Sequence, residues 1–304
     1  MQDNMIDVTI VCHTYNHEKY IRECLDGFLM QKVDFNYEVV IHDDASTDST
    51  AEIIRDYAAK YPEIFRPIYQ KENKYSQGIQ ITPQYVYPMI RGRYVALCEG
   101  DDKWIDKNKL QIQYDYLEKH QDCSMCVHNT VMNNLYTNSK KLVVNSKRDR
   151  DYSLSKVVYG GGGLFATNSI FVRKDIYMNR PECFLCKGCG DYQIVIYAAI
   201  SGRVHYINRV MSQYNYGTEE SWSRRVENDV SKLVVHRFNL IEMLNRVDRY
   251  YEYKYTKILK REMSNLKLEN YLAENNKEML RKVEYRILYW KRWIGRKLSV
   301  INRF

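Results

Sequence analysis

The sequence predicts an α/β fold in which an open sheet carries helices on its faces, followed by a helical region. Two observations support this prediction. Over the first half of the 304 residues, short apolar runs of strand length alternate with amphipathic helical patterns. Beyond Val226, apolar residues recur at helical spacing. We therefore expect an α/β domain over residues 1–220 and a helical region over residues 221–304.

The elements of the first part can be placed in order. The expected strands are residues 8–12, 37–42, 64–69 and 94–98, and the expected helices are residues 21–29, 53–61, 192–201 and a segment from Gly78 toward Arg91. Asn16 is a candidate N-cap of the first helix. Ser49 with Glu52 has the spacing of a capping box at the second helix.

Composition and charge exclude several classes of protein. Hydrophobic residues make up 45% and charged residues 28%, which is ordinary globular usage and excludes a disordered chain. The net charge of +8 is small for a dedicated nucleic-acid binder, and residues 221–304 supply it with twenty Lys and Arg against ten Asp and Glu. Neither an apolar run of about 18 residues nor a basic leader with an apolar core occurs. We expect a cytoplasmic chain that binds no nucleic acid.

Eight cysteines raise the question of a metal site or disulfides. Cys123 and Cys126 form one close pair, and Cys183, Cys186 and Cys189 form a second group. Their spacing resembles fragments of zinc or iron–sulfur frameworks. The first pair lies in an expected strand, and thiols stay reduced in the cytoplasm, so buried or loop thiols are the favoured interpretation. The role of the second group stays open.

Polar and acidic residues follow three of the expected strands. They are His13, Thr14, Tyr15 and Asn16 after the first strand, Asp43, Asp44 and Asp48 after the second, and Glu99, Asp101 and Asp102 after the fourth. Any one of them could be a turn residue or a helix cap. Ligands bind beyond the carboxyl ends of strands in open parallel sheets, however, so together these ends predict one site.

The acidic strand ends favour a metal-bound nucleotide as the ligand. Asp101 and Asp102 would repel each other without a cation, and hard divalent metals take oxygen ligands. A Gly-x-x-x-x-Gly-Lys-Ser/Thr loop and a Gly-x-Gly-x-x-Gly motif are both missing after the first strand. P-loop hydrolysis and dinucleotide binding are therefore disfavoured.

Three segments carry a family resemblance. Residues 8–16, 39–48 and 92–102 look like the three sequence blocks of the family 2 glycosyltransferases, and the resemblance extends over about residues 5–220. Members of that family are inverting enzymes with the GT-A fold, a Rossmann-like open mixed sheet with helices on both faces. The resemblance implies transfer of a sugar from a nucleoside diphosphate donor, with UDP-sugars favoured, to a hydroxyl of a saccharide acceptor. It also implies Mn²⁺ or Mg²⁺ as the cofactor.

The resemblance assigns roles to individual residues. For the nucleotide-sugar donor, it implies that His13 and Tyr15 pack on the nucleobase, together with Thr14 and Asn16. It implies that Asp44, the second residue of the pair Asp43 and Asp44, binds the edge of the base. It also implies that Asp101 contacts the ribose and phosphate. Asp102 matches the metal ligand, and Glu99 contributes less directly. The family places its catalytic base at the start of a helix in the second half, which Asp191 matches. An ordinary acidic helix N-terminus is the alternative for Asp191.

Two segments are expected near the acceptor. Many relatives follow the last strand with Tyr-Arg and then a His, but Asn215 and Gly217 stand at those positions, which leaves a third protein ligand to the metal open. The segment 217–225 is expected to be a mobile lid, in which Trp222, Arg224 and Arg225 could close over acceptor or diphosphate; a solvated basic helix start is the alternative. Residues 160–163 are four consecutive glycines, the last of which is Gly163. We expect them either to border the acceptor site or to act as a flexible linker.

The end of the chain is basic and amphipathic. Residues 286–304 contain six Lys and Arg, no acidic residue, and Trp290 and Trp293 near one helical face. A basic amphipathic helix with Trp residues is typical of a segment that lies on an anionic membrane surface. A helix that docks on a protein surface and an RNA-binding tail are the alternatives. A peripheral position at the inner face of the plasma membrane would suit a lipid-linked acceptor, as in bacterial surface-polysaccharide assembly. The other C-terminal helices are expected to pack on the first domain or on a second subunit of a homo-oligomer.

The same residues disfavour three other functions. A sugar-1-phosphate nucleotidyltransferase would need a Gly-rich loop with Arg and Lys after the first strand, and residues 13–16 are not such a loop. A non-catalytic saccharide-binding or partner-binding module would not bind UDP with Mn²⁺. Nucleic-acid binding is the weakest alternative, because the acidic strand ends would repel phosphates.

Overall fold

The computed structural model describes residues 5–290 except 145, 187, 189, 220, 222, 223 and 225–228. The chain divides into two compact units. The first is Met1–Arg180 with Ile194–Arg224, and the second is Pro181–Gln193 with Arg225–Phe304. The expected boundary between residues 1–220 and 221–304 stays a prediction.

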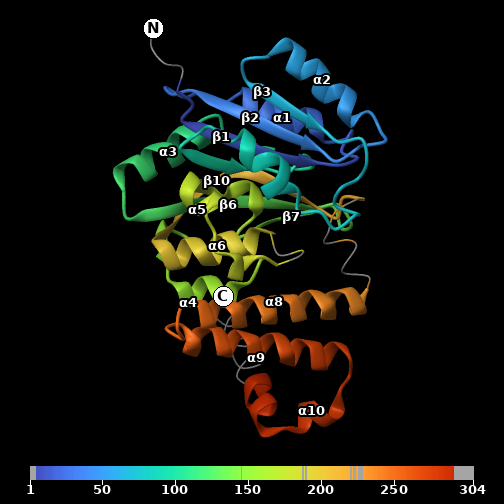
Figure 1. The fold of residues 1–304 in the computed structure, drawn as a ribbon, viewed down its shortest axis with the longest axis vertical. Helices are drawn as coiled ribbons and strands as arrows, with labels where there is room; N and C mark the ends of the chain where they lie inside the picture. Colours follow the sequence, from blue (N-terminus) through green and yellow to red (C-terminus); the bar gives the residue numbers. More distant parts are fainter. Residues whose placement is uncertain are drawn as a thin grey trace. The chain divides into compact units, whose positions relative to one another are not determined.

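One open mixed sheet forms the centre of the first unit (Figure 1). Its main strands follow the order β3-β2-β1-β4-β9-β6-β10-β5, and β7 pairs with β6 while β8 pairs with β10. The strands are β1 Val8–Thr14, β2 Tyr37–Asp43, β3 Phe65–Tyr69, β4 Tyr94–Leu97, β5 Lys103–Trp104, β6 Cys123–Asn134, β7 Ser139–Leu142, β8 Arg150–Tyr152, β9 Phe171–Arg173 and β10 Arg203–Tyr216. β1, β2, β3 and β4 run parallel, and β9 is antiparallel to both β4 and β6. The predicted open mixed sheet is confirmed.

Helices accompany the sheet as predicted. Those at or near the sheet are α1 Ile21–Leu29, α2 Thr50–Lys60, α3 Lys109–Lys119, α4 Leu154–Gly160, α5 Lys174–Met178 and α6 Gly190–Ser201. The apolar stripes of α1, α2 and α3 join the strands in one core, to which Leu25, Ile54 and Leu110 each contribute a fully buried side chain. The central strand β1 is buried along almost its whole length because both of its faces are covered.

The segment expected to be helical from Gly78 toward Arg91 is helical over residues 81–89, so this expectation is confirmed in part. The segment is not a regular α-helix: a short π-helix, η1 Thr82–Val86, is followed by a short 3₁₀-helix, η2 Tyr87–Met89. Pro83 and Pro88 stand in the first turn of η1 and of η2. A proline has no N–H to donate, so regular α-helical hydrogen bonding is not continued through this segment.

Of the two expected helix caps, one is wrong and the other is confirmed in position only. The residue before α1 is Tyr20, which makes no side-chain cap, and the Asn16 side chain accepts instead from the N–H of Thr47 at 2.8 Å. Ser49 is the N-cap residue of α2, but its side chain makes no capping hydrogen bond, and its backbone N–H donates to Glu18 at 3.1 Å. The Asn16 side chain and the Ser49 backbone thus help to join the loops after β1 and β2.

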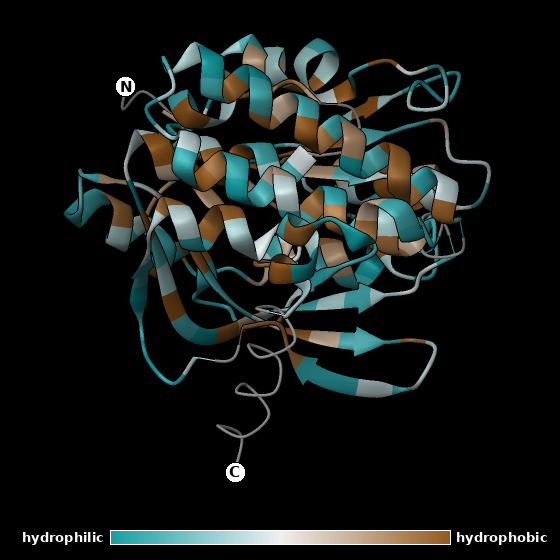
Figure 2. Cartoon of the chain, turned by 90° about the horizontal axis from the view of Figure 1, so that it is seen from below, coloured by the Kyte–Doolittle hydropathy of each residue, from teal (hydrophilic) through white to brown (hydrophobic). Residues whose placement is uncertain are grey.

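Helices also make up the second unit. They are α8 Val230–Tyr250, α9 Thr256–Ala273 and α10 Lys277–Arg281, and residues 283–290 are helical as well. The turn between α8 and α9 is fixed by Thr256, whose hydroxyl lies 2.9 Å from both carboxylate oxygens of Asp248. Among the described residues, no helix is both long and apolar enough to cross a membrane. Figure 2 shows hydrophobic and hydrophilic residues alternating along the helices.

The cysteines are free thiols at six positions. They are Cys12, Cys24, Cys98, Cys123, Cys126 and Cys183, and the first five are buried. Cys123 and Cys126 lie in β6, as expected. Cys186 is disulfide-bonded, so the expectation of free thiols throughout is wrong at this residue. Cys189, Trp222, Arg225 and residues 291–304 of the basic tail lie outside the described part of the chain.

Candidate active site

The polar ends of β1, β2 and β4 meet at one edge of the sheet. These strands are parallel neighbours, so their carboxyl ends lie side by side. Two backbone hydrogen bonds join the segments beyond them: the N–H of Asp44 donates to the carbonyl of Thr14 at 3.1 Å, and the N–H of Gly100 donates to that of His13 at 2.9 Å. The sequence prediction that these ends form one site therefore agrees with the strand pairing.

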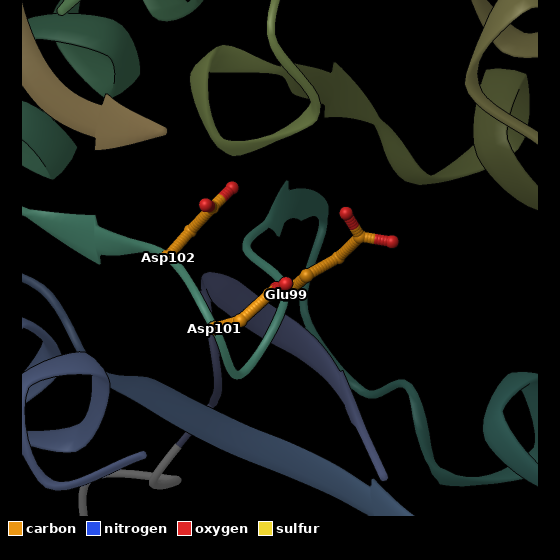
Figure 3. Close-up of side chains that lie close together, drawn as sticks. All are labelled: Glu99, Asp101 and Asp102. Atoms are coloured by element: carbon orange, nitrogen blue, oxygen red, sulfur yellow. The ribbon is translucent and has the colours of Figure 1, made fainter. Parts of the chain in front are cut away.

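Three carboxylates gather in the loop after β4. Glu99, Asp101 and Asp102 each place a carboxylate oxygen within 4.8 Å of the other two (Figure 3). Asp102 is only 1% exposed and Asp101 only 6%, while Glu99 is exposed. The group is the only one of three or more acidic, His or Cys side chains in the described residues whose atoms could hold a metal ion.

Burial and repulsion make Asp102 costly to ionise. Its pKa lies well above the usual value because the side chain is desolvated and because Asp101 and Glu99 place negative charge beside it. A divalent cation would offset both effects, and Mn²⁺ and Mg²⁺ prefer carboxylate oxygens. The residues present therefore fit such an ion.

A set of donors holds both aspartates in place. The Asp102 carboxylate accepts from the N–H of Asn215 and from the side-chain amide of Asn168, each at 2.9 Å. Asp101 accepts from the hydroxyl of Thr218 at 2.7 Å, and its carbonyl accepts from the Asn215 amide at 2.7 Å. Asn215, which lies in β10, therefore donates hydrogen bonds to both aspartates and helps to fix their positions.

Sequence reasoning missed Asn168 and Thr218 as parts of this site. Asn168 lies in the short turn η3, Thr167–Ser169, before β9. Thr218 comes just after β10. Neither residue stands in a recognisable motif. Only the order of strands brings them to the acidic loop.

The loops after β1 and β2 are joined by side chains. The N–H of Asn16 donates to the hydroxyl of Ser46 at 2.9 Å, and the N–H of His17 donates to Thr50 at 2.8 Å. Asn16 has a φ of 54°, a left-handed conformation that Asn tolerates better than most residues. Thr14 is buried and Tyr15 half-buried in the same loop.

The two aspartates after β2 have different partners. Asp43 accepts from the N–H and the hydroxyl of Ser46, at 3.2 and 2.5 Å. Burial raises the pKa of Asp43, and these hydrogen bonds oppose the rise. Asp44 accepts from the backbone N–H groups of Lys74 and Tyr75, at 2.8 and 2.9 Å. Asp44 therefore anchors the loop that leads to η1 beside the site.

His13 is held as a neutral ring. Its Nε2 lies 3.1 Å from the hydroxyl of Thr82 in η1, and its ring centroid lies 5.8 Å from that of His42. Enclosure by the protein, with His42 beside it, lowers the pKa of His13 to about 3. A neutral, fixed imidazole is suited to packing against a flat ring.

The other predicted residues lie on separate segments. Asp191 lies in the first turn of α6, half-buried, and accepts from the N–H of Tyr192 at 2.7 Å. Gly163 is exposed, with open space where a Cβ would lie. The Arg224 guanidinium lies 5.9 Å from the ring centroid of Tyr136.

The sequence matches the family model described as glycosyl transferase family 2 over residues 9–177. The chain belongs to this family. The match covers the strand ends, the acidic loop and β9, so the predicted family is confirmed.

Curated relatives match a part of the chain. An uncharacterised protein of Mycobacterium tuberculosis is 49% identical over 121 residues, which are 40% of this chain and 34% of that protein. The putative glycosyltransferase EpsE of Bacillus subtilis is 32% identical over 114 residues, 38% of this chain and 39% of its own. The abequosyltransferase RfbV of Salmonella typhimurium is 28% identical over 174 residues, 53% of this chain and 51% of its own. The chain thus spans about a third to a half of the length of these relatives.

Solved structures share the fold. A mannosyltransferase from Pyrobaculum calidifontis, in complex with GDP-Man and Mn²⁺, aligns with a TM-score of 0.59 at 16% identity over 98% of this chain and 82% of its own. TarS of S. aureus, in complex with UDP-GlcNAc, aligns with a TM-score of 0.57 at 15% identity over 88% of this chain and 81% of its own. The predicted GT-A fold is confirmed.

Proposed function

We propose that this protein transfers a sugar from a nucleoside diphosphate donor to a hydroxyl of a saccharide acceptor, with Mn²⁺ or Mg²⁺ as cofactor. The observation that carries the proposal is the cluster of Glu99, Asp101 and Asp102 at the carboxyl ends of three parallel strands. Membership of family 2 supports it. So do the nucleotide-bound neighbours, one of which holds Mn²⁺.

Asp102 would be the main protein ligand of the metal, with Asp101 and Glu99 around it. When bound, the cation would offset the charge that develops on the diphosphate leaving group. The hydrogen bonds from Asn168 and Asn215 fix the Asp102 carboxylate before the donor arrives, so little reorganisation is needed.

The nucleoside would lie at the ends of β1 and β2. His13 and Tyr15 would pack on the base, with Thr14, Asn16 and Asp43 shaping that part of the site. Asp44 would accept the imide N–H of a uracil, since each carboxylate oxygen has a lone pair beyond the one used by Lys74 or Tyr75. Asp44 supports a base that carries a ring N–H, as uracil does, over cytosine or adenine, and the neighbour TarS in complex with UDP-GlcNAc favours uridine.

The acceptor hydroxyl needs a base to take its proton as the new bond forms. We propose Asp191 for this role, with inversion at the sugar carbon. Its place in the first turn of α6, which matches the family pattern, supports the role.

The acceptor would be a saccharide of a bacterial surface polymer. Among the relatives are an abequosyltransferase and a putative teichuronic acid biosynthesis glycosyltransferase. The basic residues of 286–304 would keep the enzyme at the inner face of the plasma membrane, beside a lipid-linked acceptor. In this proposal residues 1–220 form the transferase domain.

A donor-hydrolysis screen tests the function. Purified protein is incubated with UDP-, GDP-, dTDP- and CMP-sugars and Mn²⁺ or Mg²⁺, and the released nucleotide is measured. We expect turnover of a UDP-sugar, loss of turnover on chelation of the metal, and a loss of at least about 100-fold in Asp102→Asn. The exposed Asp34→Asn is the matched control and should retain activity.

The screen separates the parts of the proposal. Hydrolysis of only a non-uridine donor would remove the assignment of a uridine donor. Full activity of Asp102→Asn would remove the metal assignment. The base is tested in a separate assay that adds a saccharide acceptor, where full transfer by Asp191→Asn would remove the proposed base.

A further inference from the structure

The ring of Tyr136 occupies the space that a side chain at position 217 would need. Gly217 has a φ of 92°, and a Cβ built there would lie 2.6 Å from Cε2 of Tyr136. Any residue other than glycine would be strained at this φ and would push the ring away. The glycine therefore allows an aromatic ring to lie directly on the backbone after β10.

The hairpin that carries Tyr136 is fixed at both sides. The side chain of Asn134 accepts from the N–H groups of Tyr136 and Thr137, at 2.9 and 3.1 Å. The N–H of Leu135 donates to the carbonyl of Tyr216 at 3.0 Å. Although its backbone is fixed in this way, the Tyr136 residue is 51% exposed. A rigid, half-exposed ring is suited to recognition, because little conformational entropy is lost on binding.

The ring stands beside the acidic cluster. Gly217 lies between Asn215 and Thr218, which donate to Asp102 and Asp101 at 2.9 and 2.7 Å. Tyr136 therefore rests on Gly217, one of the two residues that separate Asn215 from Thr218.

Other groups extend the surface around Tyr136. The ring centroid of Tyr216 lies 6.1 Å from that of Tyr136, and the two ring planes make an angle of 84°. The ring centroid of Tyr214 lies 6.2 Å from that of Tyr216. The Arg224 guanidinium, 5.9 Å from the Tyr136 ring centroid, brings hydrogen-bond donors to the same place.

The strand order puts this surface on the acceptor side. The proposed nucleoside position lies at β1 and β2, and β4 carries the acidic loop next to them. Tyr136 belongs to the β6–β7 hairpin against β10, on the far side of β4 in the sheet. In a transfer reaction the acceptor has to approach the sugar from the side away from the nucleotide.

We infer that Tyr136 is a stacking platform for the acceptor saccharide, with Arg224 as a donor to its hydroxyls. This inference rests on the proposed function. A pyranose ring has one face of C–H groups that packs on an aromatic face, and its hydroxyls need polar partners at the edge. The acceptor class is therefore a pyranoside whose apolar face covers Tyr136.

Saturation-transfer-difference NMR with methyl glycosides tests the platform. Methyl glucoside, galactoside, mannoside and N-acetylglucosaminide are titrated into the full chain in the presence of UDP and Mn²⁺. We expect at least one of them to bind, Tyr136→Ala to bind it at least about tenfold more weakly, and Tyr136→Phe to bind it within about twofold of the wild type. Tyr250→Ala, which removes another exposed tyrosine in α8, is the control for a general effect of losing a ring.

The outcomes test the role of Tyr136 separately from the proposed transferase function. If the wild type hydrolyses no nucleotide sugar, the proposed function fails. If it does hydrolyse one, the platform is wrong when no methyl glycoside binds, when Tyr136→Ala binds as the wild type does, or when Tyr136→Phe loses binding like Tyr136→Ala. Circular dichroism of each variant checks that the fold is kept.

Discussion

At the scale of single residues, Asn168 determines how the Asp102 carboxylate is presented. The Asn168 side chain is fully buried, and its amide donates to Asp102 at 2.9 Å and to the carbonyl of Gln213 at 3.1 Å. Its oxygen accepts from the hydroxyls of Ser212 and Thr130, at 2.7 and 3.3 Å. The carbonyl of Gln213 can only accept a hydrogen bond, so it fixes which end of the amide carries the NH₂ group, and this end faces Asp102.

We predict that Asn168→Ala weakens Mn²⁺ binding by about 10- to 100-fold, the usual effect of removing a group that orients a metal ligand. The measurement is a titration of Mn²⁺ in the presence of UDP, followed by electron paramagnetic resonance of the free ion. Asn179→Ala, at an exposed position at the end of α5, is the control and should bind as the wild type does. Equal Mn²⁺ affinity in both variants would show that Asn168 has only a packing role.

Asn168 also shows what the sequence could not predict at this scale. Asp101 and Asp102 were predicted because they stand together in a family motif at a strand end. Asn168 stands 66 residues after Asp102 without a motif of its own, and only the pairing of β9 with β4 brings it there. A residue that acts through tertiary structure leaves no local signal.

At the scale of elements, the close approach of the segment before β4 to β1 depends on Gly92. Its N–H donates to the buried hydroxyl of Thr9 at 2.9 Å. A Cβ at Gly92 would lie 2.4 Å from the backbone N of Thr9 and 2.7 Å from the carbonyl carbon of Val8. Those atoms belong to the central strand and cannot move aside without disturbing its pairing on both sides.

We therefore predict that Gly92→Ala lowers the free energy of unfolding by about 3 kcal/mol or more. Gly163→Ala is the matched control, because open space surrounds that position, and it should change stability by no more than about 1 kcal/mol. Urea unfolding followed by circular dichroism gives both values. Similar midpoints for the two variants would mean that β1 and the Gly92 segment are not held together as described.

The strands were predictable from the sequence and the caps were not, for one physical reason. The run before His13 is apolar because both faces of β1 are buried, and that pattern is local. Ser49 stands at the N-cap of α2 but makes no side-chain hydrogen bond there. Asn16 is a residue type that caps helices in general, but here its side chain accepts from the N–H of Thr47 in the loop after β2. Long-range competition for the same polar groups overrides a local preference.

At the scale of the whole molecule, the acidic cluster and its hydrogen-bond partners belong to one compact unit. Asp102, Asn168, Asn215 and Thr218 all lie in the first unit, so the proposed metal and donor site is assembled from that unit alone. Asp191 belongs to the short segment Pro181–Gln193 of the second unit. We therefore expect donor and metal binding to depend on the first unit.

Stability should depend on pH through one buried lysine of the first unit. Lys109, at the start of α3, is fully buried, and its Nζ has no hydrogen-bond partner among the described residues; it lies 3.8 Å from the Trp104 ring centroid. Burial lowers the pKa of Lys109 from 10.5 to about 7. Electrostatic interaction with Cys98 and Cys126 raises this pKa, but by less than burial lowers it. Between pH 7 and 10.5 the unfolded chain holds a proton at this residue that the folded chain lacks, so the Lys109 contribution to stability falls as the pH is lowered through this window. Buried thiols act in the opposite direction above about pH 9, because burial raises the pKa of Cys98 and of Cys123 to about 11.

We predict that Lys109→Met raises the free energy of unfolding at pH 7 by about 3 to 5 kcal/mol over that of the wild type, as 1.36 kcal/mol per pKa unit implies. This difference should shrink as the pH rises to about 10, where Lys109 is deprotonated in both the folded and the unfolded chain. Below pH 6.5 both proteins should still lose stability, because burial also lowers the pKa of His13 and of His128 to about 3 and the unfolded chain takes up those protons first. Urea unfolding at pH 5, 7, 8.5 and 10 measures both windows, with the exposed Lys119→Met as the control. A stability difference between Lys109→Met and the wild type that stays the same from about pH 7 to 10 would show that Lys109 stays charged in the folded protein.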